Sequence, residues 1–509
     1  MTIHPRRLFP VILAAFLLPV APRAAEAPPD DGPRITITVS EATNLIHWVD
    51  NLAGTSIGKT KPIYRRYWQE RFGPFDAEDR LALETFIRIR TLPLPTPFRI
   101  ANVSGCLPIP ADTLGWHQDF LIAAMRSTSI TSFAQRLADR LTEEQRADLV
   151  KALERFQPRF ERAWKDLKHV RRFRKRFERY FDRGDLRAYL RDMARFFGVD
   201  AAAAPAMKIS LIGLPRDGPT HAEADGDHLL IEIRPQDSPR DQIQVVAHEA
   251  AHFLMRQMSA EQIDRLARQV FAKHPAGALV WRLLWESLPT SLGQGLAEAR
   301  LDPSRFSLSQ PWYHISQIDQ FAKLIYPAVV DSMGRRQGVG DGLMARLTGL
   351  MSRSPLYRRA PTISFLMTAF YVSGEGLEQP LLRLRRRVGT GQAGDPMSFS
   401  LGEPEGADLL RRFECLGGVI LVAPDELVRA ARLGGSMVLS DAALIRTLAM
   451  VQRGDSVIAT GRRPAGGTIF FLVAPRRSAA PRLVEAFTQM RGIPDAPLAV
   501  IEKNDKPLH

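Results

Sequence analysis

The sequence VVAHEAAHFL, residues 245–254, places two histidines four positions apart, with a glutamate directly after the first. The preceding Ser-Pro-Arg-Asp (238–241) supplies a capping serine, a proline at the first helical position and an acid at the third, which is typical of a helix start. In a helix, His248 and His252 lie one turn apart on the same face, close enough to bind one ion. Glu249 lies about 100° further round, beside that ion but displaced from the ligand direction.

Two interpretations of this helix compete. In the first, the histidines and the glutamate are unrelated residues on a mostly apolar helix, but burying them without partners is unfavourable. In the second, they form a metal site, and the strand-like runs at 208–214 and 227–234 provide the context that such a motif requires. Cys106 and Cys415 are the only cysteines, so any metal must be held by nitrogen and oxygen atoms. The sequence favours the metal site.

The motif, behind the run DHLLIEIRP (227–235), resembles that of the zincin metallopeptidases over about residues 205–330. The resemblance implies that the two histidines bind one Zn2+ ion and that the strand before the helix is the edge along which substrate lies. No third histidine follows at the metzincin spacing, so the resemblance is to the gluzincins and implies a downstream glutamate as third ligand. The implied function is zinc-dependent hydrolysis of peptide bonds in a peptide or protein substrate, with zinc-bound water activated by Glu249.

Two glutamates are the main candidates for the third ligand. Glu286 lies in the apolar run ALVWRLLWESLPTSLG, where a carboxylate needs a partner and zinc would be one. Its competing interpretation is an ion pair with Arg282 one helical turn earlier. Glu298 lies in GQGLAEAR, which is similar to the Glu-Gly-x-Ala segment of some gluzincins, although Gln294 stands where that glutamate would be. We favour Glu286, and Glu298 remains open.

A hydrogen-bond donor for the tetrahedral oxyanion is expected besides zinc. Gluzincins often use a downstream Tyr or His, and the segment PWYHISQIDQF offers Tyr313 and His314. Each of them has the competing interpretation of a half-buried residue at the start of a helix. His221, in the turn before the strand at 227–234, is a weaker candidate.

The expected fold class is α+β and mostly helical, in 509 residues that are enough for roughly two to four domains. Residues 34–200 have a helical pattern, residues 205–390 form the zincin-like metallopeptidase domain, and residues 405–509 form a small α/β domain. A linker or long loop is expected at 389–408. The last region contains the near-repeats VILVAP and FFLVAP, each followed by a helical pattern and neither by a nucleotide-binding fingerprint.

Residues 1–27 are typical of a secretory signal peptide. Two arginines precede a short apolar run, and Ala25-Glu26-Ala27 offers a cleavage site. A membrane anchor is the alternative, but the run is short and interrupted by prolines. We therefore expect an exported protein, periplasmic or secreted, in which Cys106 and Cys415 have the opportunity to pair. Their separation in sequence provides no geometric support for that pair.

The net charge of +14 concentrates in residues 155–197, where aromatic residues recur at helical spacing between basic ones. This pattern indicates either a core-facing aromatic stripe with a solvated basic back, which we favour, or a helix that contacts an anionic envelope surface. Export makes nucleic acid a poor partner. As an alternative to the peptidase, the chain is a non-catalytic zincin-like binding protein or a cell-envelope adaptor, although the intact Glu249 argues for catalysis.

Overall fold

The structure is a computed structural model of the chain. The residues that it describes are 33–55, 61–94, 105–107, 115–182, 184–340, 342–366, 369–388, 397–433 and 438–500. The expected signal peptide lies outside these residues. The described residues are mostly helical with two separate sheets, which confirms the α+β fold class. No helix among them is both long and apolar enough to cross a membrane.

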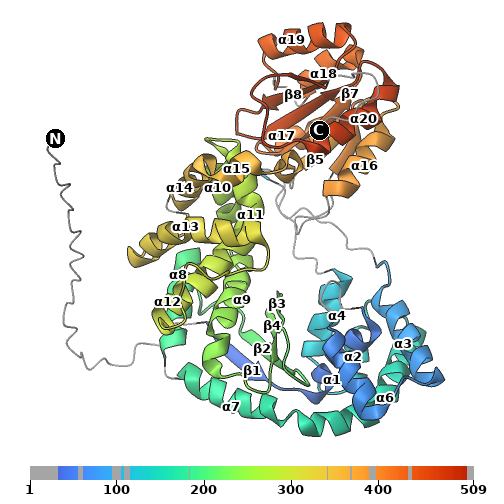
Figure 1. Ribbon diagram of the computed structural model, residues 1–509, viewed down its shortest axis with the longest axis vertical. Helices are drawn as coiled ribbons and strands as arrows, with labels where there is room; N and C mark the ends of the chain where they lie inside the picture. Colours follow the sequence, from blue (N-terminus) through green and yellow to red (C-terminus); the bar gives the residue numbers. More distant parts are fainter. Residues whose placement is uncertain are drawn as a thin grey trace, which may run out of the picture. The chain divides into compact units, whose positions relative to one another are not determined.

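The first sheet has four strands in the order β1-β2-β4-β3 (Figure 1). Their bounds are Ile35–Thr38 for β1, Met207–Gly213 for β2, Ala222–Asp225 for β3 and His228–Ile233 for β4. β1, β2 and β4 are parallel, and β3 is antiparallel to β4. The strand directly before the motif helix, β4, is paired on both sides, so the expectation that it forms the sheet edge is wrong. The edge strand beside it is β3.

The region 34–200 is helical as expected, except that it begins with a strand. The helices are α1 (Glu41–Ala53), α2 (Pro62–Phe72), α3 (Ala77–Arg90), α4 (Trp116–Met125), α5 (Ile130–Arg136), α6 (Glu143–Asp166), α7 (Lys168–Asp182) and α8 (Asp185–Phe197). Ser40 caps α1, and its side chain accepts a hydrogen bond from the backbone N–H of Thr43. The alternating, β-branched segment at 35–38 instead adds a strand to the first sheet, so this region and the strands at 207–233 share one sheet.

The aromatic stripe of residues 155–197 lies in the core. Phe156, Phe160, Phe173 and Phe177 are at most 1% exposed. The favoured interpretation of this stripe is confirmed, and the basic residues between the aromatic ones lie outside the core.

The motif helix and its successors follow the first sheet. They are η1 (Pro239–Gln242), α9 (Ile243–Arg256), α10 (Ala260–Phe271), α11 (Ala276–Thr290), the π-helix η2 (Ser291–Ala297), α12 (Glu298–Leu301), α13 (Ser316–Gly334), α14 (Leu343–Arg353), α15 (Pro355–Arg359) and η3 (Thr362–Phe365). Ser238 and Asp241 form the predicted capping box, but the turn that they start is a 3₁₀ turn, so the α-helix begins at Ile243. Ser259 and Gln262 start α10 with a second capping box.

The second sheet has six strands in the order β10-β8-β9-β7-β5-β6 (Figure 1). Their bounds are Ala369–Ser373 for β5, Met397–Ser400 for β6, Gly417–Val422 for β7, Ser456–Arg462 for β8, Thr468–Val473 for β9 and Leu498–Val500 for β10. The helices of this part are α16 (Glu378–Val388), α17 (Pro404–Arg412), η4 (Pro424–Glu426), α18 (Leu427–Ala431), α19 (Asp441–Gln452), η6 (Arg477–Ala479) and α20 (Ala480–Gln489). The two near-repeats form β7 and β9, which are adjacent and parallel.

The boundary expected between residues 390 and 405 falls inside this second sheet. β5 belongs to it, although the sequence places residues 369–373 in the preceding domain. β6 and α17 begin within the expected linker at 389–408, of which only 389–396 lie outside the described residues. The sequence misses this boundary because a short apolar strand between helices gives no clear periodicity.

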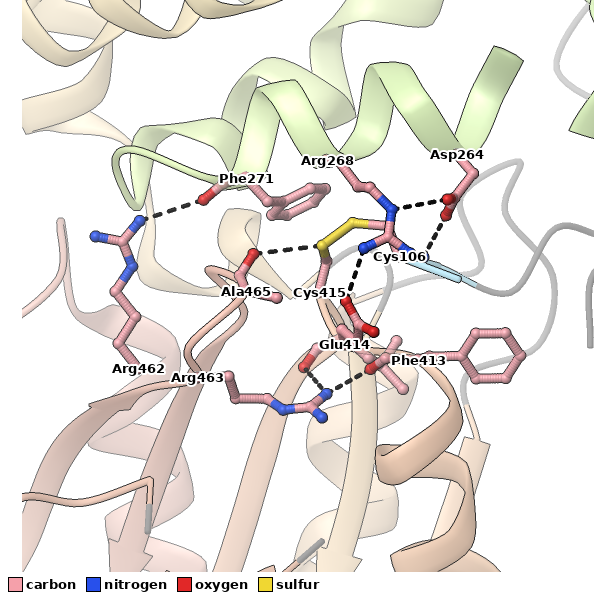
Figure 2. Close-up of a disulfide and its surroundings, with 11 residues drawn as sticks. Cys106, Asp264, Arg268, Phe271, Phe413, Glu414, Cys415, Arg462, Arg463 and Ala465 are labelled. Atoms are coloured by element: carbon pink, nitrogen blue, oxygen red, sulfur yellow. Dashed lines mark hydrogen bonds and ion pairs between the residues drawn. A yellow bond between two sulfur atoms is a disulfide. The ribbon is translucent and has the colours of Figure 1, made fainter. Parts of the chain in front are cut away.

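Cys106 and Cys415 form a disulfide, with their Cα atoms 4.6 Å apart (Figure 2). Asp264 on α10 accepts a hydrogen bond from the backbone N–H of Cys106. Arg268 pairs with Asp264 at 2.9 Å and with Glu414 at 2.7 Å. The helix that follows the motif helix is thus connected, through the disulfide and these ion pairs, to the segment that leads into β7.

Candidate metal centre

α9 places the motif residues where the sequence predicts them. The Nε2 atoms of His248 and His252 lie 3.2 Å apart, and the two ring centroids 4.9 Å. His248 and Glu249 are buried, at 6% and 7% exposure, and His252 is partly buried. The carboxylate of Glu249 makes no hydrogen bond to another described residue.

Glu286 on α11 completes a cluster of three potential ligands. Its Oε2 atom lies 3.7 Å from Nε2 of His248 and 3.5 Å from Nε2 of His252. A tetrahedral zinc ion with ligand bonds of about 2.0–2.1 Å holds neighbouring ligand atoms about 3.3 Å apart. The observed spacing and the two-nitrogen, one-oxygen donor set therefore suit zinc. Among the described residues this is the one group of three His, Cys, Asp or Glu side chains arranged to hold a metal ion.

The structure does not bring Glu298 into this cluster. Glu298 begins α12, and burial raises the pKa of its carboxyl group. The competing ion pair of Glu286 with Arg282 is also not formed within the described residues. Burial lowers the pKa of the Arg282 guanidinium, and the one charge effect on it comes from Tyr371 of the second sheet.

Charge in the cluster favours a bound cation. Burial opposes ionisation of Glu286, but hydrogen bonds from His248 and His252 outweigh it and hold the pKa of this carboxyl group well below its usual range. Burial likewise opposes a charged His248, yet the hydrogen bond to Glu286 and the charge of Glu249 raise the pKa of the imidazole. The protein therefore presents an ionised carboxylate to two imidazoles. A divalent cation would compete with protons for these three side chains.

Gln294 supports His248 from the other side of the imidazole, a role that the sequence did not reveal. Its Oε1 atom lies 3.2 Å from Nδ1 of His248, so an Nδ1–H donates to the amide and Nε2 keeps its lone pair for a metal. Gln294 lies in the π-helix η2, which packs against α9. A Cβ atom at Gly293 would lie 2.6 Å from the Gln244 carbonyl oxygen and 2.8 Å from Cβ of His248, so only glycine allows this approach. Gln294 thus contacts one of the three potential ligands.

Tyr313 lies beside the cluster and His314 lies outside it. The phenol of Tyr313 donates a hydrogen bond to Oε2 of Glu286 at 3.1 Å, and its ring stacks on His248 with centroids 6.1 Å apart. Burial and the charge of Glu286 raise the pKa of Tyr313, which keeps the phenol protonated as a donor. His314 is exposed, and its ring stacks on the Tyr313 ring with centroids 4.6 Å apart.

A buried glutamate on β4 organises the turn before the edge strand. Glu232 is 1% exposed and accepts hydrogen bonds from Tyr64 at 2.7 Å and from the backbone N–H of His221 at 2.7 Å. It also pairs with His47 at 3.0 Å and with Lys61. The imidazole of His221 points to Glu223 on β3, at 3.4 Å, and does not join the metal cluster. The acid in the buried run HLLIEI was the sequence signal for this network.

No protein-family model, curated protein or solved structure matches this chain.

Proposed function

We propose that the protein is a zinc-dependent peptidase of the gluzincin-like zincin type, acting on a peptide or protein substrate. His248, His252 and Glu286 would hold the ion, and Glu249 would act as the base. The observation that carries this proposal is the convergence of two histidines and a carboxylate on one point, with the buried Glu249 next to the first histidine. Cys106 and Cys415 leave no cysteine for an alternative zinc site because they form a disulfide.

Each residue has a distinct task in the proposed reaction. A zinc ion held by His248, His252 and Glu286 would supply Lewis acidity and would lower the pKa of a water molecule toward about 7. The Glu249 carboxylate takes a proton from the attacking water and passes it to the leaving amine nitrogen. The Tyr313 phenol, protonated because of its raised pKa, turns from Glu286 to donate a hydrogen bond to the developing oxyanion. Gln294 holds the tautomer of His248 that leaves Nε2 available.

Export to the periplasm or beyond the cell is part of the proposal. The disulfide supports it, because disulfides persist in oxidising compartments and are rare in reducing ones. The alternative, a non-catalytic zincin-like binding or adaptor protein, keeps the same three ligands. It predicts zinc binding without hydrolysis, so activity distinguishes the two.

The experiment incubates a mixture of peptides from denatured proteins with zinc-loaded wild type or zinc-loaded Glu249→Gln. Mass spectrometry identifies the cleavage products. We expect Glu249→Gln to retain zinc and to lose at least about 10²-fold in hydrolysis, because it lacks the general base. Glu261→Gln, an exposed glutamate early in the next helix, is the matched control and should cleave like wild type. Equal cleavage by wild type and Glu249→Gln would contradict the mechanism.

A further inference from the structure

One face of α7 carries an unusual concentration of positive charge. Residues 168–179 contain seven Lys and Arg and one Glu, a net charge of +6 in a chain whose total is +14. We call the exposed basic residues the α7 basic face: Lys168, Arg171, Arg172, Lys175, Arg176 and Arg179.

The fold does not neutralise this charge internally. Arg174 and Glu178 form an ion pair at 3.4 Å, which uses the one acid of the segment. Arg176 donates to the backbone carbonyl of Asp237, and the Arg171 guanidinium lies over the Trp164 ring. Among the described residues, no carboxylate forms an ion pair with any member of the α7 basic face. All six residues are exposed, and Lys168, Arg172, Lys175 and Arg179 form the part of this face that contacts no other element in these interactions.

The geometry of the face suits a flat partner. Lys168, Arg172, Lys175 and Arg179 recur at intervals of four and three, so they line one side of the helix over about 16 Å. The opposite side is fixed to the first sheet, where His169 lies 3.2 Å from the carbonyl oxygen of Ile233. Figure 1 shows α7 alongside the β1 and β2 strands, and contacts with both strands agree. A rigid row of charges is thus presented without rearrangement.

The apolar residues of α7 are not available to a partner. Val170, Phe173, Phe177 and Phe181 are at most 5% exposed, so the helix cannot insert apolar side chains into a bilayer. Binding through this face is therefore electrostatic and sensitive to salt. Stacking on bases is excluded for the same residues, which removes the interaction that single-stranded nucleic acids use. The disulfide further favours a partner outside the reducing cytosol.

We infer that the α7 basic face docks the protein on the surface of a membrane that contains anionic phospholipids. Headgroup phosphates spread over a plane can meet the row of Lys168, Arg172, Lys175 and Arg179 at once. Because α7 also contacts η1, the turn that leads into α9, docking would fix the orientation of the metal centre relative to the membrane. This inference does not require the metal centre to be catalytic.

The test is co-sedimentation with vesicles of phosphatidylcholine alone or with about one-quarter phosphatidylglycerol. Wild type should partition at least about tenfold more strongly onto the anionic vesicles and should be released at about 0.5 M salt. The variant Lys168→Glu/Arg172→Glu/Lys175→Glu/Arg179→Glu should lose that preference. All four side chains are exposed, so an unchanged thermal transition is expected for a folded variant.

A matched control distinguishes the effect of the α7 basic face from the effect of the protein's net charge. Arg358→Glu/Arg359→Glu/Arg429→Glu/Arg446→Glu changes the net charge equally at exposed arginines away from α7, and should keep the preference within about threefold. Equal losses in the two variants, or no preference of wild type for anionic vesicles, would overturn the inference. So would tighter binding of wild type to duplex DNA than to anionic vesicles at the same salt.

Discussion

The Oε2 atom of Glu286 lies 3.5 Å from Nε2 of His252, on a helix that the motif itself does not include. This contact favours Glu286 over Glu298 as the proposed third ligand. Glu286→Ala should lower zinc affinity by at least about 10²-fold, because it removes a ligand and leaves two imidazoles. Competition with a coloured chelator measures the affinity. Glu298→Ala is the control and should bind zinc like wild type; the reverse order would place the third ligand on Glu298.

The amide of Gln294 is expected to tune zinc affinity without binding zinc. Gln294→Ala should lower the affinity about 10- to 100-fold, because His248 loses the acceptor that fixes its tautomer. Gln317→Ala, at an exposed position of α13, should leave the affinity unchanged. Rescue by Gln294→Glu, which restores an acceptor for Nδ1–H, would distinguish the hydrogen bond from packing. Failure of Gln294→Ala to change the affinity would remove this role.

Tyr313 and His314 should differ in their effects on turnover. Tyr313→Phe should keep zinc and lower kcat by about 10²- to 10³-fold, because the phenol that contacts Glu286 is lost. His314→Ala should lower kcat by less than about threefold, since this imidazole is exposed and contacts only the Tyr313 ring of the site. Steady-state kinetics on one peptide identified from the digestion measures both. A larger loss for His314→Ala would reverse the assignment.

Glu232 should make the free energy of unfolding depend on pH in the acid range. Burial opposes its charge, but the hydrogen bonds and charges of His47 and Lys61 outweigh burial and lower its pKa to about 2 from 4.5. Because the folded pKa is the lower one, the stabilisation is complete above about pH 4.5 and is lost as the pH falls toward 2. Denaturant titrations between these pH values in wild type and Glu232→Gln should attribute a loss on the order of 3 kcal/mol to Glu232.

The control for this pH dependence removes the carboxyl group of Glu232. Glu232→Gln should be less stable at pH 7 and should show a flatter dependence between pH 4.5 and 2, whereas Glu154→Gln, at an exposed position of α6, should behave like wild type. If Glu232→Gln retained the full acid dependence, another carboxyl group would be its source.

Most of the features that could be predicted from the sequence depend on residues close together in the chain. His248 and His252 lie one turn apart on one helix, and Glu249 directly follows His248. Their relative positions therefore follow from helix periodicity alone. Glu286 was a sound candidate because a carboxylate in an apolar helix requires a partner. The caps of α1 and α10 depend on residues three positions apart, so they too are features that a sequence alone can predict.

Contacts between distant segments were beyond the sequence. The pairing of β1 with β2 joins residues 35 and 207, and the disulfide joins residues 309 apart, and neither leaves a local pattern. Gln294 was visible as a departure from a motif, but its contact with His248 depends on a π-helix and on the close approach at Gly293. The fold determines these relationships through packing, which periodicity does not encode.

The most direct test of the central claim is the zinc content of the purified chain after loading and gel filtration. We predict one zinc ion per chain in wild type, and loss of that ion in His248→Ala and in His252→Ala, with the fold retained as judged by circular dichroism. His274→Ala, which changes a histidine outside the cluster, should keep one ion. A wild-type chain without stoichiometric zinc, or a His248→Ala chain that still holds one ion, would contradict the account.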